Sequence, residues 1–110
     1  MGRNVTKLIL VVTAVRSKEE AVELSRTVVE KRMAACAQVL GPVTSTYWWK
    51  GRIETVEEWL CLMKSNADLY EKLESTICNI HSYEVPEIFS LTATRSNRRY
   101  LDWLERELEK

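Results

Sequence analysis

Three side chains near residue 80 could bind a metal ion. His81 is the only histidine, and Cys78 precedes it by three residues, so a helix would place both on one face. Glu87 could add a carboxylate. Imidazole, thiolate and carboxylate groups suit Cu(2+) or another divalent metal. In the alternative reading His81 caps a helix and hydrogen-bonds locally, Glu87 pairs with a nearby base, and the position of Cys78 is a coincidence.

One histidine with one thiolate and some carboxylates makes a sparse metal site. An oligomer can assemble ligands that no single chain holds. We therefore expect any metal binding to depend on contacts between copies of the chain.

Four aromatic residues, Tyr47, Trp48, Trp49 and Trp59, form a second group. Such side chains could line a ligand pocket, because they combine a large contact area with a polar tip. They could equally pack in a subunit interface, which is the interpretation the sequence favours.

A third group is basic: Lys64, Arg95, Arg98 and Arg99. These residues could hold an anionic metabolite in a cleft between subunits. The chain has only three glycines and no Gly-rich phosphate loop. A solvated surface is therefore the simpler interpretation of Arg98 and Arg99.

The sequence offers little for catalysis. It contains no G-x-S-x-G turn and no Ser-His-Asp arrangement. Glu57 and Glu58 are adjacent, so on a strand they would point to opposite faces. We expect a protein that is not an enzyme and that uses no organic cofactor.

Composition limits the protein class. The chain has 110 residues, which fits a single domain spanning 1–110, and sixteen basic residues balance sixteen acidic ones. Nucleic-acid binding is driven by clustered Lys and Arg, so this balance predicts no such partner. The longest apolar run, residues 8–15, is far shorter than the roughly 20 residues needed to cross a bilayer.

The three cysteines indicate a reducing compartment. Cys36, Cys61 and Cys78 are odd in number and have no C-x-x-C spacing, so neither a disulfide framework nor a structural zinc site is expected. Cys36 and Cys61 lie in apolar, strand-like runs and are interpreted as small buried side chains. The sequence thus predicts a cytoplasmic protein.

These groups must be positioned by strands and helices. The apolar run 8–12 predicts a central strand buried on both faces. Ser17 to Glu20 forms a capping box in which Glu20 can reach back, and a helix with apolar Ala21, Leu24, Val28 and Val29 follows. A second helix is expected to open at residues 65–68, with its apolar face formed by Leu69, Leu73, Ile77 and Ile80. Residues 88–93 predict a fourth strand, and a closing helix begins near residues 96–97, with Tyr100 or Leu101, Leu104 and Leu108 as its apolar stripe.

Between the first two helices the pattern predicts a long β-hairpin. Residues 35–49 and 52–64 are rich in β-branched and aromatic residues, and Lys50-Gly51 provides a tight turn. Gly41-Pro42 marks a break or bulge. Arms this long would span roughly 45 Å at about 3.3 Å per residue. A chain of this size cannot cover such a ribbon, so part of it is expected to contact a neighbouring subunit.

The predicted order is strand, helix, strand, strand, helix, strand, helix. We expect each crossover to join neighbouring parallel strands and the central pair to be antiparallel. This is an α+β, ferredoxin-like split β-α-β arrangement with helices on one face. The other face would meet solvent or a partner.

Five sequence blocks resemble the CutA divalent-cation tolerance family in order and spacing, over about residues 7–108. The blocks are Thr13-Ala14, residues 33–36, residues 47–53, residues 81–88 and residues 100–104. The resemblance implies a ferredoxin-like subunit in a homotrimer whose long strands extend onto the next subunit. It also implies a role in copper and divalent-metal tolerance, and it puts metal-site proposals on His81 and Glu87.

Two positions depart from the family pattern. Ser82 replaces the proline of the usual His-Pro-Tyr, so the loop loses a residue that would stiffen it. Some bacterial members carry a proposed metal-binding cysteine at the end of the first strand, where this chain has Val11 or Val12. Metal binding through that cysteine does not carry over.

Three functions remain open at this point. The first is a metal-responsive or metal-binding trimer, the second a small-metabolite-sensing signalling trimer, and the third a scaffold that anchors another protein.

Overall fold

The computed structural model describes residues 7–109, so the ends of the predicted domain at residues 1 and 110 lie outside it. The elements alternate as the sequence predicts, and the α+β fold class is confirmed. In chain order they are β1 (Leu8–Val15), α1 (Lys18–Glu30), β2 (Cys36–Trp49), β3 (Arg52–Asn66), a 3-10 turn η1 (Ala67–Leu69), α2 (Tyr70–Ile80), β4 (Ile88–Thr92) and α3 (Arg98–Glu107). None of the helices within residues 7–109 has both the length and the apolar character needed to traverse a bilayer.

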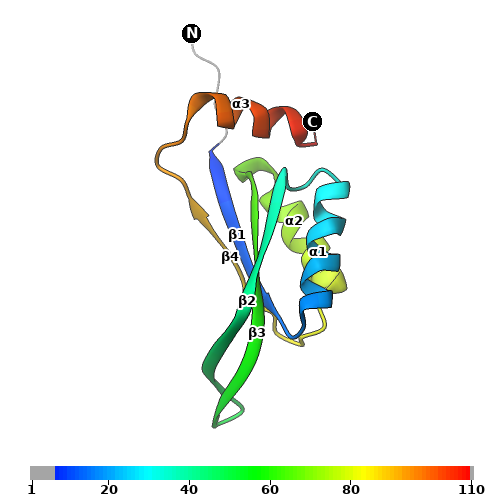
Figure 1. The fold of residues 1–110 in the computed structure, drawn as a ribbon, viewed down its shortest axis with the longest axis vertical. Coiled ribbons are helices and arrows are strands. Elements are labelled where there is room, and N and C mark those ends of the chain that lie inside the picture. Colours follow the sequence, from blue (N-terminus) through cyan, green and yellow to red (C-terminus); the bar gives the residue numbers. More distant parts are fainter. Residues whose placement is uncertain (1–6, 110) are drawn as a thin grey trace.

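The four strands form one antiparallel sheet in the order β2-β3-β1-β4 (Figure 1). β1 is antiparallel to both β3 and β4, and β3 is antiparallel to β2. The expectation that each crossover joins neighbouring parallel strands is therefore wrong. β1 and β2 run parallel with β3 between them, and β3 and β4 run parallel with β1 between them, which is the split arrangement.

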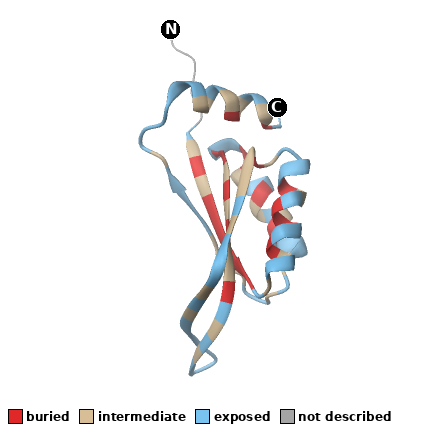
Figure 2. Cartoon of the chain, viewed as in Figure 1, coloured by how far each residue is buried: buried red, intermediate tan, exposed pale blue. Residues whose placement is uncertain are grey.

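Two helices cover one face of the sheet. α1 and α2 lie side by side on that face, and α3 crosses the end of the sheet near the start of β1 (Figure 1). The main core lies between α1, α2 and the sheet, as the buried segments in Figure 2 indicate. Its fully buried members include Val11, Leu24, Met63, Leu73 and Ile77. A smaller cluster under α3 contains Leu69, Leu104 and Leu108.

Some predicted apolar positions are not buried. Val29 at the end of α1 and Ile80 at the end of α2 are 37% and 44% exposed, whereas Val28 and Ile77 one turn or less away are fully buried. Cys61 is fully buried as expected, whereas Cys36 is only half-buried and Cys78 is exposed. The second helix begins later than predicted, because Ser65 and Asn66 complete β3 and Asn66 caps η1 through Leu69 N–H.

The long hairpin and its turn are confirmed. Trp49 pairs with Arg52, so the loop contains only Lys50 and Gly51. Both have positive φ, 51° for Lys50 and 79° for Gly51, which is the signature of a type I′ turn. The predicted irregularity is also present, since the register between β2 and β3 shifts between Leu40 and Val43.

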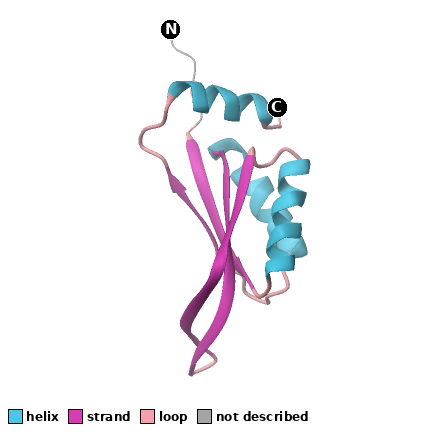
Figure 3. Cartoon of the chain, in the orientation of Figure 1, coloured by secondary structure: helices cyan, strands magenta, loops and turns pink. Residues whose placement is uncertain are grey.

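The far half of the hairpin stands apart from the rest of the sheet (Figure 3). β1 pairs with β3 only as far as Val15 opposite Trp59. Residues 43–49 and 52–58 therefore pair with each other alone within residues 7–109. We call residues 43–58 the distal ribbon. It stretches the chain to 54 × 25 × 22 Å.

Candidate functional site

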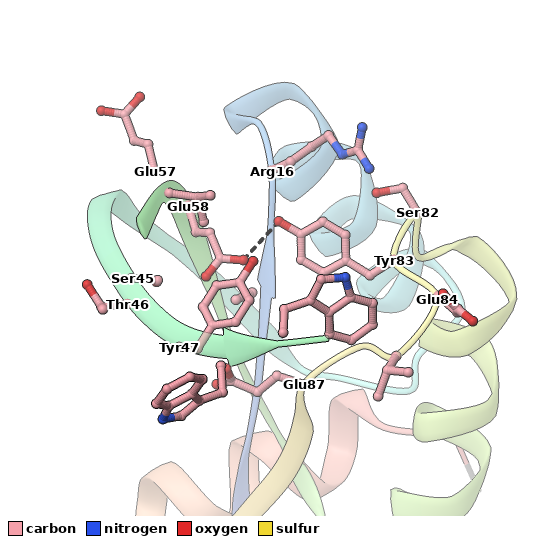
Figure 4. Close-up of a pocket in the computed structure, with 15 residues that line it drawn as sticks. Arg16, Ser45, Thr46, Tyr47, Glu57, Glu58, Ser82, Tyr83, Glu84 and Glu87 are labelled. Carbon is pink, nitrogen blue, oxygen red and sulfur yellow. Dashed lines mark hydrogen bonds between the residues drawn. The ribbon is translucent and has the colours of Figure 1, made fainter. Parts of the chain in front are cut away.

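A single open cleft collects most of the aromatic and acidic residues of interest. It has a volume of about 980 Å³ and lies between the distal ribbon and the loop that joins α2 to β4. Its walls come from residues 45–49 and 56–58 of the ribbon, from residues 82–85 and Glu87 of the loop, from Ala14 near the end of β1 and from Arg16 just after β1 (Figure 4).

A hydrogen bond between Tyr83 and Glu58 joins the two walls. The Tyr83 hydroxyl donates to Glu58 Oε2 at 2.8 Å (Figure 4). Glu58 is only 5% exposed, although it is a carboxylate on a strand. Burial, the hydrogen bond and the negative charge of Glu58 all raise the pKa of Tyr83. Tyr83 therefore stays neutral and acts as a donor, and Glu58 carries the negative charge of the pair.

His81 attaches the loop between α2 and β4 to the end of β1. Its Nε2 lies 2.8 Å from the Ala14 carbonyl oxygen, and its Nδ1 lies 3.1 Å from the Tyr83 amide nitrogen. A carbonyl can only accept and an amide N–H can only donate. The ring is therefore the neutral Nε2–H tautomer, with Nδ1 as acceptor. The centres of the Tyr83 and His81 rings lie 4.9 Å apart, so Tyr83 contacts His81 through its ring as well as through its amide.

Glu20 ties the loop to α1. Ser17 caps α1 by accepting from the Glu20 amide, as the capping box predicts. The Glu20 carboxylate, however, accepts from the Ser82 amide and the Ser82 hydroxyl, both at 3.2 Å, where it was expected to reach back to the cap. The amide bond requires an N–H, which a proline at this position would lack. Ser82 thus restrains the loop in another way than the family's proline would.

The predicted metal ligands lie at different places. His81 lies beneath Tyr83 with both ring nitrogens hydrogen-bonded. Glu87 is exposed and lines the cleft, and Cys78 is exposed on α2. Within residues 7–109 no three His, Cys, Asp or Glu side chains of the chain are grouped so that they could hold a metal ion.

Three of the four predicted aromatic residues line the cleft. Tyr47, Trp48 and Trp49 are 40%, 71% and 37% exposed on the distal ribbon. Trp59 lies elsewhere, because it packs against the main core and over Gly41.

None of the four predicted basic residues lines the cleft. Lys64 lies over the Tyr100 ring at 5.9 Å, Arg98 faces Asp102 at 3.9 Å, and Arg95 and Arg99 are exposed. This fits the solvated-surface interpretation of Arg98.

Sequence reasoning missed Glu58, Tyr83 and Arg16 as cleft residues. Glu57 and Glu58 do alternate as predicted, since Glu58 bonds Tyr83 while Glu57 is exposed at the rim (Figure 4). Glu58 lies in a strand-like stretch that also contains Glu54 and Glu57, so its residue type alone gave no signal that it is the buried one.

Comparisons with known proteins agree on one family. A family model described as CutA1 divalent ion tolerance protein matches residues 9–107. The divalent-cation tolerance protein CutA of Thermus thermophilus is 38% identical over 86% of this chain and 92% of its own length. Protein CutA of Mus musculus is also 38% identical, over 84% of this chain, but this chain spans only about half (52%) of the mouse protein.

Solved structures agree with the sequence relatives. CutA1 from Oryza sativa has a TM-score of 0.92 at 30% identity and covers 96% of both chains. A protein from Archaeoglobus fulgidus, described as a periplasmic divalent cation tolerance protein CutA, has a TM-score of 0.90 at 27% identity, over 93% of this chain and 99% of its own.

Proposed function

The chain belongs to the family of CutA1 divalent ion tolerance proteins, and on this premise we propose that it acts in copper and divalent-cation tolerance as a homotrimer that binds metal without catalysing a reaction. The single observation that supports a homotrimer is that, within residues 7–109, the two strands of the distal ribbon pair only with each other. The family membership carries the link to divalent cations.

The distal ribbon needs a partner for its own stability. An isolated two-stranded hairpin is only marginally stable in water. The ribbon nevertheless has Trp48 and Ile53, 71% and 61% exposed, paired opposite each other near its tip. Docking onto a second copy would bury these side chains and pair the free strand edges, which otherwise invite aggregation.

The sheet face opposite α1 and α2 supports the same proposal. Side chains alternate along a strand, so the neighbours of the core residues Val11 and Met63 point to this open face. Leu10 pairs with Leu91 and Val12 with Phe89, and Leu91 and Phe89 are 56% and 43% exposed. An exposed apolar patch of this kind on an open sheet face is typical of a subunit interface.

The assembly is tested with two matched substitutions. Leu91→Lys places a charge on the open face, whereas Val22→Lys places one on an apolar residue of α1 that is 49% exposed. Light scattering is expected to give three times the chain mass for the wild type and Val22→Lys, and a smaller mass for Leu91→Lys. A wild type that is monomeric at micromolar concentration would overturn the trimer.

The geometry sets conditions on the metal site. The only lone pair on the His81 ring is at Nδ1, and it accepts the Tyr83 amide. Coordination by His81 would require that bond to open. Glu87 is exposed in the cleft and needs no such change. We propose that Glu87 and His81 contribute ligands and that other copies of the chain complete the set, with Cys78 as a weaker candidate.

Metal binding is tested by calorimetric titration of Cu(II) and Zn(II). Glu87→Gln and His81→Ala should each weaken binding by roughly tenfold or more, as expected when a metal loses a ligand or a group that orients one. Glu71→Gln, an exposed carboxylate on α2, is the control and should leave the isotherm unchanged. A Glu87→Gln isotherm that matches the wild type would remove Glu87 from the site.

We further propose a cytoplasmic location, supported by the three free cysteines. Thiol labelling of the protein in freshly lysed cells, with fractionation, tests this. Recovery with a periplasmic or secreted fraction would contradict it.

A further inference from the structure

We infer that the cleft between the distal ribbon and the 82–87 loop is a binding site for a small organic cation, whose ammonium group is held against aromatic rings and next to carboxylates. The inference goes beyond the proposed function and does not depend on metal binding.

The charge of the cleft differs from that of the chain. The chain as a whole is formally neutral, with sixteen basic and sixteen acidic residues. The cleft is lined by four carboxylates, those of Glu57, Glu58, Glu84 and Glu87, against the single guanidinium of Arg16. A concave surface with an excess of one sign of charge concentrates its field and attracts counterions. The expected ligand is therefore cationic.

The aromatic walls already bind cations of the chain itself. The Arg16 guanidinium lies 5.6 Å from the centre of the Tyr83 ring, and the Lys50 ammonium lies 5.5 Å from the centre of the Trp49 ring. Both distances are within the range at which a cation is attracted to a ring face. The side chains of this region thus provide the recognition chemistry that an alkylammonium group requires, and Tyr47 supplies a further ring in the same cleft.

Glu58 supplies a fixed negative charge at the cleft wall. Only 5% of Glu58 is exposed, and its Oε2 accepts a 2.8 Å hydrogen bond from the Tyr83 hydroxyl. A buried carboxylate is costly unless something compensates its charge. Tyr83 is neutral and provides a hydrogen bond but no charge. A bound ammonium group would add a second positive charge beside that of Arg16, against the four carboxylates of the cleft.

The dimensions favour a molecule over a bare ion. The carboxylates line a cleft of about 980 Å³ and are separated by rings, and within residues 7–109 no three of the potential ligands converge on one point. Clefts of this size are typical of small-molecule sites.

The probe is tetramethylammonium chloride, titrated by calorimetry and by the shifts of the indole N–H resonances. tert-Butanol serves as the neutral analogue of similar shape, and sodium chloride controls for ionic strength. We expect saturable binding with a Kd on the order of 1 mM, since the ligand has only five heavy atoms. tert-Butanol should bind at least about tenfold more weakly.

Two variants and one control assign the site. Glu58→Gln keeps an acceptor for Tyr83 but removes the charge, and should weaken binding by roughly tenfold. Tyr47→Leu removes one exposed ring and should weaken it by about two- to thirtyfold. Glu71→Gln on α2 should have no effect. Circular dichroism confirms that each variant is folded.

Each outcome has a definite reading. Saturable binding that Glu58→Gln and Tyr47→Leu both weaken supports the inference. Absence of binding, or equal binding of tert-butanol, overturns it. A cationic side chain of a second copy could occupy the same cleft. In that case tetramethylammonium would not saturate and Glu58→Gln would lower the mass measured by light scattering, which also overturns a free-ligand site. Glu58→Gln and Tyr47→Leu leave the proposed metal ligands Glu87 and His81 unchanged, and the copper titration is carried out separately on the wild type and on variants of those two residues.

Discussion

The hydroxyl of Tyr83 donates a 2.8 Å hydrogen bond to the carboxylate of Glu58, 25 residues earlier in the chain. This bond connects the loop after α2 to Glu58, which directly precedes Trp59, the residue of β3 where pairing with β1 begins. The ribbon leaves the sheet at this point, so the pair fixes the geometry of the cleft. Removing it should affect both stability and the cleft.

The first prediction concerns Tyr83→Phe. It leaves the buried Glu58 carboxylate without its hydroxyl donor, and an unsatisfied buried polar group costs about 1–3 kcal/mol. Denaturant unfolding at fixed protein concentration should show a loss of this size. Tyr70→Phe is the control, since Tyr70 donates to Glu74 within one helical turn at 3.2 Å and should cost under about 1 kcal/mol. Equal losses in both variants would contradict the special role of Tyr83.

A pH dependence follows from the same pair. Burial, followed by the bond to Glu58, raises the pKa of Tyr83 in the folded protein. Unfolded tyrosine releases its proton near pH 10. Above that pH the unfolded state binds fewer protons than the folded state, so stability falls as pH rises. Unfolding curves between pH 9 and 11 should show this decline, with a smaller slope in Tyr83→Phe. An unchanged slope in the variant would assign the decline to other groups.

The tautomer of His81 is a separate prediction. Since Ala14 offers a carbonyl and Tyr83 offers an amide, the proton must be on Nε2. Long-range proton–nitrogen NMR of the His81 ring should show that Nδ1 carries no proton. His81→Ala should destabilise the fold by about 1–3 kcal/mol, because the Ala14 carbonyl and the Tyr83 amide both lose their partner. A proton found on Nδ1 would rule out this hydrogen-bond arrangement.

Much of the fold could be predicted because the informative signals are local. The positive φ of Lys50 and Gly51, the cap at Ser17 and the long alternating arms all follow from neighbouring residues. Strand order could not be read in the same way. We expected each strand-helix-strand connection to join neighbouring parallel strands. In the structure β3 lies between β1 and β2, where its apolar residues Cys61 and Met63 complete the core.

The cleft was harder to predict, since its contacts join distant segments. Glu20 and Ser82 are 62 residues apart, and His81 and Ala14 are 67 residues apart. The residue types at these positions suggested local roles, a capping box and a helix cap. The sequence did single out the aromatic group, because Tyr47, Trp48 and Trp49 are consecutive, although the interpretation that it favoured for them was a subunit interface.

The turn of the distal ribbon gives a further prediction. A side chain at φ of 79° is strained, so Gly51→Ala should destabilise the protein by about 1–2 kcal/mol. Lys50 already has positive φ, and asparagine tolerates that region better than lysine does. Lys50→Asn should therefore raise the midpoint of thermal unfolding. If Lys50→Asn lowered the midpoint while Gly51→Ala had no effect, the type I′ assignment would be wrong.

The last prediction concerns the contact between Gly41 and Trp59. A Cβ added at Gly41 would lie 2.6 Å from Trp59 Cδ1, 2.9 Å from Cγ and 3.1 Å from the Glu58 carbonyl oxygen. The Trp59 ring packs against the main core, so it cannot move away freely. Gly41→Ala should therefore cost about 1–3 kcal/mol, the usual range for overpacking.

A double-mutant cycle separates this steric effect from a backbone effect. Trp59→Leu removes the atoms that the new methyl group would meet, so Gly41→Ala should cost much less in that background, with a coupling energy of about 0.5–3 kcal/mol. Protein concentration is held fixed, because an assembled protein unfolds in a concentration-dependent way. Additive losses would mean that the cost arises from the backbone at Gly41. A large coupling would establish that Trp59 requires glycine at the point where β2 shifts register and the ribbon begins.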